Sequence, residues 1–136
     1  MKIKQRYYLS KVVKVLEKVL DEKDKDVFLS AKDRFNSITY HKYSDTAFYE
    51  HILKLVHKEL FNILAELDFE DETFPIIDEV TMTLSDVMNE DEETYYYTVK
   101  DSTGEHEHAT DREGHVIGIL EWALDYIVGN IEVEEI

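Results

Sequence analysis

The chain of 136 residues carries 31 acidic and 15 basic side chains, a formal net charge of −16 at pH 7. Its length fits one domain, 1–136, and its 43% hydrophobic and 12% aromatic residues are typical of a folded protein, which excludes wholesale disorder. Because the chain has no cysteine, disulfides, thiolate metal sites and cysteine nucleophiles are excluded as well.

The two signs of charge are segregated along the chain. Residues 1–60 carry thirteen Lys or Arg and nine Asp or Glu, a net +4, and form a mildly basic half that is predicted to be helical. Residues 61–136 carry two Lys or Arg and twenty-two Asp or Glu, a net charge of −20. Nucleic acid and anionic lipid repel such a charge. We therefore expect a basic protein as partner, with no direct nucleic-acid binding and no membrane binding.

The N-terminal part predicts two helices. From Leu9 to about Asp24, apolar residues recur every three or four positions, the period of an amphipathic helix. Lysines and acids interrupt that run, so it does not read as an export signal, and we expect a cytoplasmic protein. After Asp26 a shorter helix is predicted, with an apolar face made of Phe28, Ala31, Phe35 and Ile38.

The strongest helical pattern follows a predicted connection at Thr39–Tyr43, and Ser44 or Asp45 is its expected N-cap. Its apolar stripe is expected to form the centre of the core and consists of Phe48, Ile52, Leu55, Val56, Leu60, Ile63, Leu64 and Leu67. Acids at 68–72 end this helix.

Two interpretations of residues 75–89 remain open. Pro75 suits the first turn of a helix, and a helical spacing joins Ile77, Val80, Leu84, Val87 and Met88. The alternation of Val80, Met82 and Leu84 with threonines is also compatible with a strand.

The last third predicts a hairpin and a final helix. Thr94–Lys100 has strand composition, Asp101–Gly104 suits a turn, and Glu105–Ala109 returns, so a hairpin over about 94–109 is expected to pack against the helices. Thr110 and Glu113 match a capping box for a helix closed by Gly129 and Asn130, and the tail 131–136 alternates as an edge strand would. The predicted fold class is α+β, a single small domain of four to five helices with this hairpin.

The excess of acids suggests imitation of nucleic acid. A net charge of about 2–8 is enough for solubility in a small domain, whereas duplex DNA presents one negative charge per about 1.7 Å of axis to proteins that grip it with Lys and Arg. The predicted partner-binding residues are the acids Glu66, Asp68, Glu70, Asp71, Glu72, Asp78, Glu79, Asp86, Glu90, Asp91, Glu92 and Glu93, and the tyrosines Tyr95, Tyr96 and Tyr97. Incidental acidity and simple cross-strand packing of the tyrosines are the alternatives.

Four residues near the predicted turn form a weaker candidate for a metal site. His106 and His108 are two apart, so on a strand they share a face, and Asp111 and His115 follow. An exposed polar strand is the competing interpretation.

No phosphate-binding loop, dinucleotide fingerprint or nucleophile elbow is present, so neither a catalytic residue nor a cofactor is predicted. The leading hypothesis is a non-enzymatic acidic protein that blocks a basic nucleic-acid-handling protein, as a phage-type inhibitor, an immunity protein or an antitoxin does. A metal-binding protein or metal-dependent enzyme and a small regulatory subunit with incidental acidity remain as alternatives.

Overall fold

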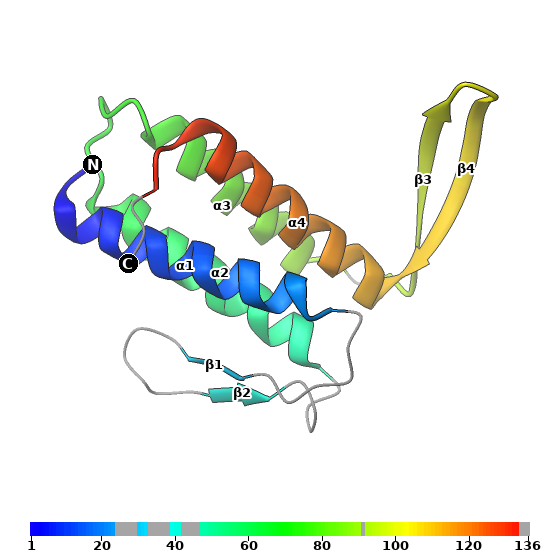
Figure 1. Ribbon diagram of the computed structural model, residues 1–136, viewed down its shortest axis with the longest axis horizontal. Helices are drawn as coiled ribbons and strands as arrows, with labels where there is room; N and C mark the ends of the chain where they lie inside the picture. Colours follow the sequence, from blue (N-terminus) through cyan, green and yellow to red (C-terminus); the bar gives the residue numbers. More distant parts are fainter. Residues whose placement is uncertain (24–29, 33–38, 42–46, 91, 134–136) are drawn as a thin grey trace.

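In the part of the chain that the structure describes, the fold consists of four helices and two small sheets (Figure 1). The computed structural model describes residues 1–23, 47–90 and 92–133, and the backbone alone for 30–32 and 39–41. The helices are α1 (Ile3–Asp21), α2 (Phe48–Glu66), α3 (Phe74–Met88) and α4 (Arg112–Asn130), and the strands are β1 (Ser30–Lys32), β2 (Thr39–His41), β3 (Thr94–Asp101) and β4 (Gly104–Asp111). The predicted α+β class, with a hairpin in the C-terminal half, is confirmed.

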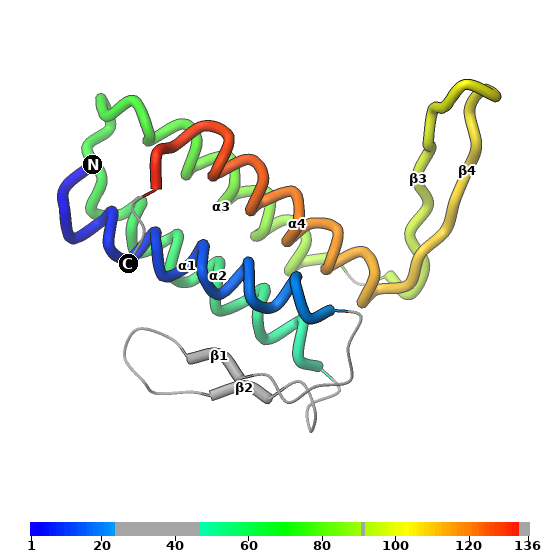
Figure 2. Tube along the Cα trace, in the orientation of Figure 1, coloured from blue at the N-terminus to red at the C-terminus, as the bar shows by residue number. Residues whose placement is uncertain are grey.

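The helices form an antiparallel bundle. Each packs against its neighbours in the order α1, α2, α3, α4, and α4 closes the ring on α1. Successive helices run in opposite directions (Figure 1), as in an up-down-up-down four-helix bundle. The α1–α2 and α3–α4 connections leave the same end, and each contains a two-stranded antiparallel sheet. The α2–α3 connection lies at the other end, beside the N-terminus (Figure 2).

The core is one apolar cluster between the helices. Its largest fully buried side chains include Leu9 and Leu16 of α1, Phe48, Ile52, Leu53, Leu60 and Ile63 of α2, Ile77 and Leu84 of α3, and Leu120 and Ile127 of α4. The apolar stripes predicted from Leu9, from Phe48 and after Pro75 therefore face the core. At the margins of the helix faces, Leu20, Leu64, Met88, Ile117 and Leu124 are half-buried and Val128 is exposed.

Polar contacts extend α1 beyond its apolar stripe. The helix begins at Ile3, six residues before the predicted start at Leu9, and ends at Asp21. The buried amide of Gln5 accepts a hydrogen bond from the Lys2 backbone N (2.7 Å) and donates one to the Glu66 backbone oxygen of α2 (2.8 Å). Apolar periodicity misses this first turn because its anchor is a glutamine.

The prediction of a second short helix after Asp26 is wrong where the structure describes that segment. Ala31 belongs to β1 and pairs with Tyr40 of β2 in an antiparallel ladder, so part of the predicted connection Thr39–Tyr43 is also strand. Phe28, Phe35 and Ile38 lie outside the described residues. A helix of that length is marginal by itself, whereas Thr and Tyr favour strand pairing.

The start of α2 also differs from its prediction. Ala47 occupies the N-cap position of α2 and makes no side-chain capping bond. Ser44 and Asp45, the expected caps, lie outside the described residues. The packing of the buried Phe48, not a capping side chain, therefore accompanies the start of this helix.

Residues 75–88 form a helix, which decides between the two interpretations left open. Pro75 lies in the first turn of α3, where its missing N–H removes no helical hydrogen bond. Leu84 is fully buried and Met82 is 59% exposed, although a strand would place both on one face. The buried Thr81 hydroxyl donates a hydrogen bond to the Ile77 backbone oxygen (2.7 Å), so the polar group of this side chain is satisfied within the helix.

Asp111 caps α4, and the predicted capping box at Thr110 is wrong by one residue. The Asp111 carboxylate accepts a hydrogen bond from Gly114 N (2.8 Å). A Cβ atom at Gly114 would lie 2.1 Å from the Thr110 hydroxyl, so a larger residue there would force the Thr110 side chain to move. The helix ends at Asn130 as expected, whereas 131–133 form no strand and 134–136 lie outside the described residues.

Candidate interaction surface

The β3–β4 hairpin stands away from the bundle (Figure 1). Of the sixteen residues in its two strands, only Tyr95 and Thr110, which face each other at the base, are half-buried, and the other fourteen are exposed. The predicted packing against the helices therefore occurs at the base alone.

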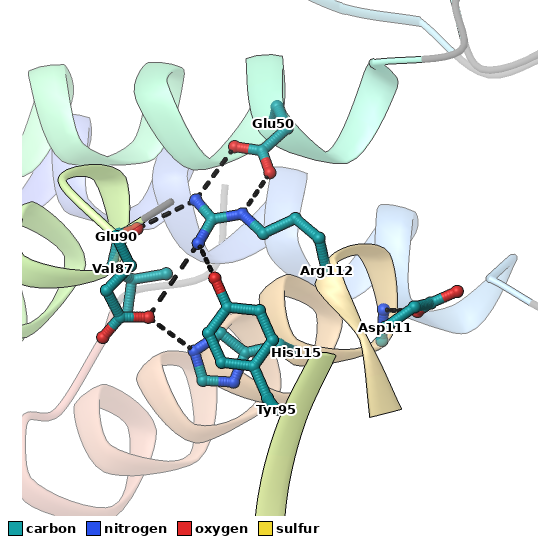
Figure 3. A network of polar contacts seen from close by, with 8 residues as sticks. Glu50, Val87, Glu90, Tyr95, Asp111, Arg112 and His115 are labelled. Carbon is teal, nitrogen blue, oxygen red and sulfur yellow. Dashed lines mark hydrogen bonds and ion pairs between the residues drawn. The ribbon is translucent and has the colours of Figure 1, made fainter. Parts of the chain in front are cut away.

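Arg112, the first residue of α4, holds this base against three helices (Figure 3). Its guanidinium donates to both Glu50 carboxylate oxygens of α2 (2.5 and 3.2 Å), to the Tyr95 hydroxyl of β3 (2.8 Å) and to the Val87 backbone oxygen of α3 (2.8 Å). The hydrogen bond to Glu50, and then that to Tyr95, raise the pKa of Arg112 above its ordinary value, although burial opposes the shift. The charged form of Arg112 is thus a fixed part of the structure.

His115 extends this network by one turn of α4. Its ring stacks on Tyr95 with centroids 3.9 Å apart and planes 5° apart, and its Nε2 lies 3.1 Å from a Glu90 carboxylate oxygen (Figure 3). Arg112 Nη1 approaches the same oxygen at 3.9 Å. We call this network the Arg112 clamp, made of Glu50, the Val87 carbonyl, Glu90, Tyr95, Arg112 and His115. It sets the direction in which the hairpin leaves the bundle.

Beyond the clamp, the strand register divides the hairpin into two faces. Residues that pair directly share a face, so one face carries Tyr97, Val99, His106 and His108, and the other carries Tyr96, Thr98, Lys100, Glu105, Glu107 and Ala109. Tyr96 and Tyr97 are 70% and 50% exposed, on opposite faces. Of the three predicted contact tyrosines, these two are accessible, whereas Tyr95 is committed to the clamp.

The four candidate metal ligands do not converge. His106 Nε2 lies 2.7 Å from the Thr103 hydroxyl oxygen, with which it shares a hydrogen bond, and 3.3 Å from an Asp101 carboxylate oxygen. The His108 ring stacks on the Tyr97 ring with centroids 5.6 Å apart. Asp111 caps α4, and His115 belongs to the clamp. Among the described residues, no three His, Cys, Asp or Glu side chains are placed to share a metal ion.

The predicted acidic residues occupy three parts of the surface. Nine of them are exposed: Glu66, Asp68, Glu70 and Glu72 at the α2–α3 end, Glu79 and Asp86 on α3, and Glu90, Glu92 and Glu93 at the hairpin end. Asp71 and Asp78 are half-buried, and Asp91 lies outside the described residues. The set therefore extends along α3 from one end of the bundle to the other.

The exposed face of α3 connects the two end clusters. Positions 75, 79, 82, 86 and 89 are exposed and repeat at three and four residues, so they form one line along the helix. We call this line the α3 ridge, with Pro75, Glu79, Met82, Asp86 and Asn89 in order. Tyr126 of α4 donates a hydrogen bond to Glu79, so the ridge borders α4.

The basic side chains lie mainly on the other pair of helices. The exposed lysines are the N-cap residue Lys2 and, on α1 and α2, Lys4, Lys11, Lys14, Lys18, Lys54 and Lys58. Helix α3 has no Lys or Arg, and the single one in α4 is Arg112, which the clamp binds. The segregation of charge along the sequence thus becomes a segregation between helix pairs.

Asp71 contributes to stability in a way that depends on pH. The Met1 ammonium group and both the backbone N and hydroxyl of Thr73 (2.9 and 2.7 Å) donate to its carboxylate, and these bonds, that of Met1 first, lower the pKa of Asp71 to about 2. A carboxylate with a lowered folded-state pKa stabilises the fold above its unfolded value, near 3.8, and loses that contribution as the pH falls toward 2.

We expect Asp71→Asn to lower the urea midpoint at about pH 6, with a difference from the parent protein that shrinks between about pH 4 and pH 2. Urea denaturation of both proteins between about pH 2 and pH 6 measures this difference in midpoint. Asp68→Asn is the control, since that carboxylate accepts one exposed hydrogen bond, from Glu70 N (3.0 Å). A difference for Asp71→Asn that persists undiminished at pH 2 contradicts the assignment.

Sequence inspection missed Arg112 and Glu50. A signal for Arg112 was present, because Lys100 and Arg112 are the only cations after residue 60. A lone arginine in an acidic segment is a natural partner for buried carboxylates. Glu50, which lies 62 residues away in the chain, carries no such signal.

The chain matches no protein-family model, no curated protein and no solved structure. None of the helices in the described part of the chain is both long enough and apolar enough to cross a membrane.

Proposed function

We propose that this protein is a non-enzymatic binding protein that imitates nucleic acid and blocks a basic, nucleic-acid-handling protein. The roles that fit this proposal are a phage-type inhibitor of a host protein, an immunity protein and an antitoxin that neutralises a basic toxin. The observation that carries the proposal is the α3 ridge with the acid clusters at its two ends. Since α3 has 15 residues, the ridge alone is about 22 Å long, and the whole of 66–93 contains no Lys or Arg.

The sign and the extent of the charge support the comparison with nucleic acid. A 22 Å segment of duplex DNA carries about 13 phosphate charges. The ridge itself carries two exposed acids, Glu79 and Asp86, and the other seven exposed acids between Glu66 and Glu93 lie beyond its two ends, so the charge is spread over a longer surface at a lower density than in DNA. A row of Lys and Arg that grips DNA would meet a row of carboxylates here. Binding would release counterions in the same way, so it should weaken as salt increases.

Apolar groups beside the ridge favour a protein as the partner. Met82 lies on the ridge and is 59% exposed. On α4, the half-buried ring of Tyr126, whose hydroxyl bonds to Glu79 of the ridge, stacks on the half-buried ring of Trp122 with centroids 5.3 Å apart. Methionine, tryptophan and tyrosine are enriched in protein interfaces, and the two aromatic rings supply contact area with little loss of entropy. Acids around such groups suit a basic protein surface.

A competition experiment tests the proposal. The immobilised protein is incubated at low salt with extracts of the source organism and its likely host, and bound proteins are eluted with duplex DNA or with a salt gradient. We expect one nucleic-acid-binding protein in stoichiometric amount, displaced by DNA. Scattered basic proteins that leave at modest salt, with no displacement by DNA, would overturn the proposal.

The position of the acids, not the net charge, is expected to determine affinity for this partner. Glu79→Gln with Asp86→Asn on the ridge should weaken binding about fivefold to tenfold, as two exposed ion pairs would. Glu17→Gln with Asp21→Asn removes the same two charges from the exposed face of α1 and should change affinity less than twofold. Equal losses in both variants, measured by calorimetry, would indicate a non-specific charge effect.

A further inference from the structure

The β3–β4 hairpin contributes little to the stability of the fold, which suggests that it serves another purpose. A single two-stranded hairpin is only marginally stable in water, and the helices cover this one only at Tyr95 and Thr110. Yet its exposed residues include Tyr96, Tyr97 and Val99, which favour strand structure and apolar contact. Tyr97 and Val99 lie on one face and Tyr96 on the other, so both faces of this projecting element offer apolar contact to a partner.

The clamp makes the hairpin a prepared docking element. Arg112 joins the base of β3 to α2 and to the end of α3 through four hydrogen bonds, and His115 stacks beneath Tyr95. The direction of the strands is therefore set before any partner arrives. Such preorganisation reduces the entropy lost on binding.

Both long edges of this sheet are open. Within the described residues, β3 and β4 pair only with each other, so the outer backbone N–H and C=O groups of each strand have no neighbouring strand. An extended peptide adds to such an edge through main-chain hydrogen bonds, and its alternate side chains give specificity.

Charge distinguishes the two edges. The β4 strand carries Glu105, Glu107 and Asp111 and no Lys or Arg, whereas β3 carries one cation and one acid, Lys100 and Asp101. A third strand beside β4 places its own side chains next to those acids at cross-strand distance, where opposite charges stabilise the pair. The β4 edge therefore suits a basic strand.

We propose that the β3–β4 hairpin captures an extended, basic segment of a protein partner, which adds to β4 as a third strand. Its Lys or Arg side chains would lie beside Glu105 and Glu107, and its alternate apolar side chains beside the face of Tyr97, Val99, His106 and His108. Only one part of this inference, the basic character of the partner protein, rests on the proposed function. The docking mode follows from the open, acidic edge.

A nine-residue blocked peptide that alternates lysine with valine is the probe, added to the complete ¹⁵N-labelled chain. We expect shift changes along Gly104–Asp111 and at least tenfold slower amide exchange there, because the new strand protects the β4 backbone. A peptide with glutamate in place of lysine, and one with a central proline, should not bind, since they lack the charge and the donors respectively.

Two double variants with the same loss of charge locate the binding site. Glu105→Gln with Glu107→Gln should weaken peptide binding about fivefold, while Glu79→Gln with Asp86→Asn should leave it unchanged. Retained contact between the Tyr97 and His108 rings shows that the hairpin of the first variant is folded. This contact is read from nuclear Overhauser effects.

Three results would overturn the inference. Peptide binding that is lost only in the ridge variant places the site on α3 and leaves the proposed function intact. The absence of β4 amide protection by any of the peptides removes the docking mode. If the β4 amides are protected in the absence of peptide, and this protection increases with protein concentration, the occupant of the edge is a second copy of this chain.

Discussion

Replacing Arg112 by methionine is expected to lower the free energy of unfolding by about 2–3 kcal/mol and to free the hairpin from the bundle. The change leaves the half-buried Glu50 carboxylate without its guanidinium donor and removes one of the hydrogen bonds to the Val87 carbonyl, which keeps the one from Glu90 N (3.2 Å). An unsatisfied buried polar group costs about 1–3 kcal/mol, more when charged. Urea denaturation measures the stability, and ¹⁵N relaxation of 94–111 measures the order of the hairpin.

Lys100→Met is the matched control for this substitution. Lys100 is the cation of the hairpin itself, but its side chain is 77% exposed and pairs with Glu105 at 3.3 Å near the tip. Such a surface pair contributes about 0–1 kcal/mol, so we expect a small change in stability and an ordered base. If Arg112→Met unfolds at the same urea concentration as Lys100→Met, the clamp does not hold the hairpin.

The second large effect is expected in α3. Leu84→Ala should lower the free energy of unfolding by about 3 kcal/mol, because it leaves a cavity in the centre of the bundle. Met82→Ala removes as many heavy atoms two residues earlier, but from a side chain that is 59% exposed, so its effect should stay within about 0.5 kcal/mol. Urea denaturation of both variants gives the comparison.

This pair also tests the secondary structure of the segment. On a helix, residues two apart point to different sides, whereas on a strand they point to the same side. Comparable losses for Leu84→Ala and Met82→Ala would therefore contradict α3, and with it the α3 ridge.

The pattern of residues was sufficient to predict the helices that build the core. The stripes beginning at Leu9 and Phe48, the helix after Pro75 and the hairpin turn at Asp101–Gly104 all appear in the structure. Burial of one side of a helix leaves a period that can be read locally. At Gln5 a polar contact decides the conformation, and at Ala31 the pairing of two short strands does; no helical period marks either, and both predictions failed.

For the candidate surface, the sequence by itself determined which residues are acidic and that their charge is segregated, and it placed His106 and His108 on one strand face. Only the tertiary structure decided which of them act together. In the folded chain, the acids lie at the two ends of the bundle and along the α3 ridge between them. The candidate metal ligands lie apart, and the Tyr95 hydroxyl bonds to Arg112 in the clamp. The reason is that these outcomes depend on contacts such as that of Arg112 with Glu50, whose distance along the chain leaves no local pattern.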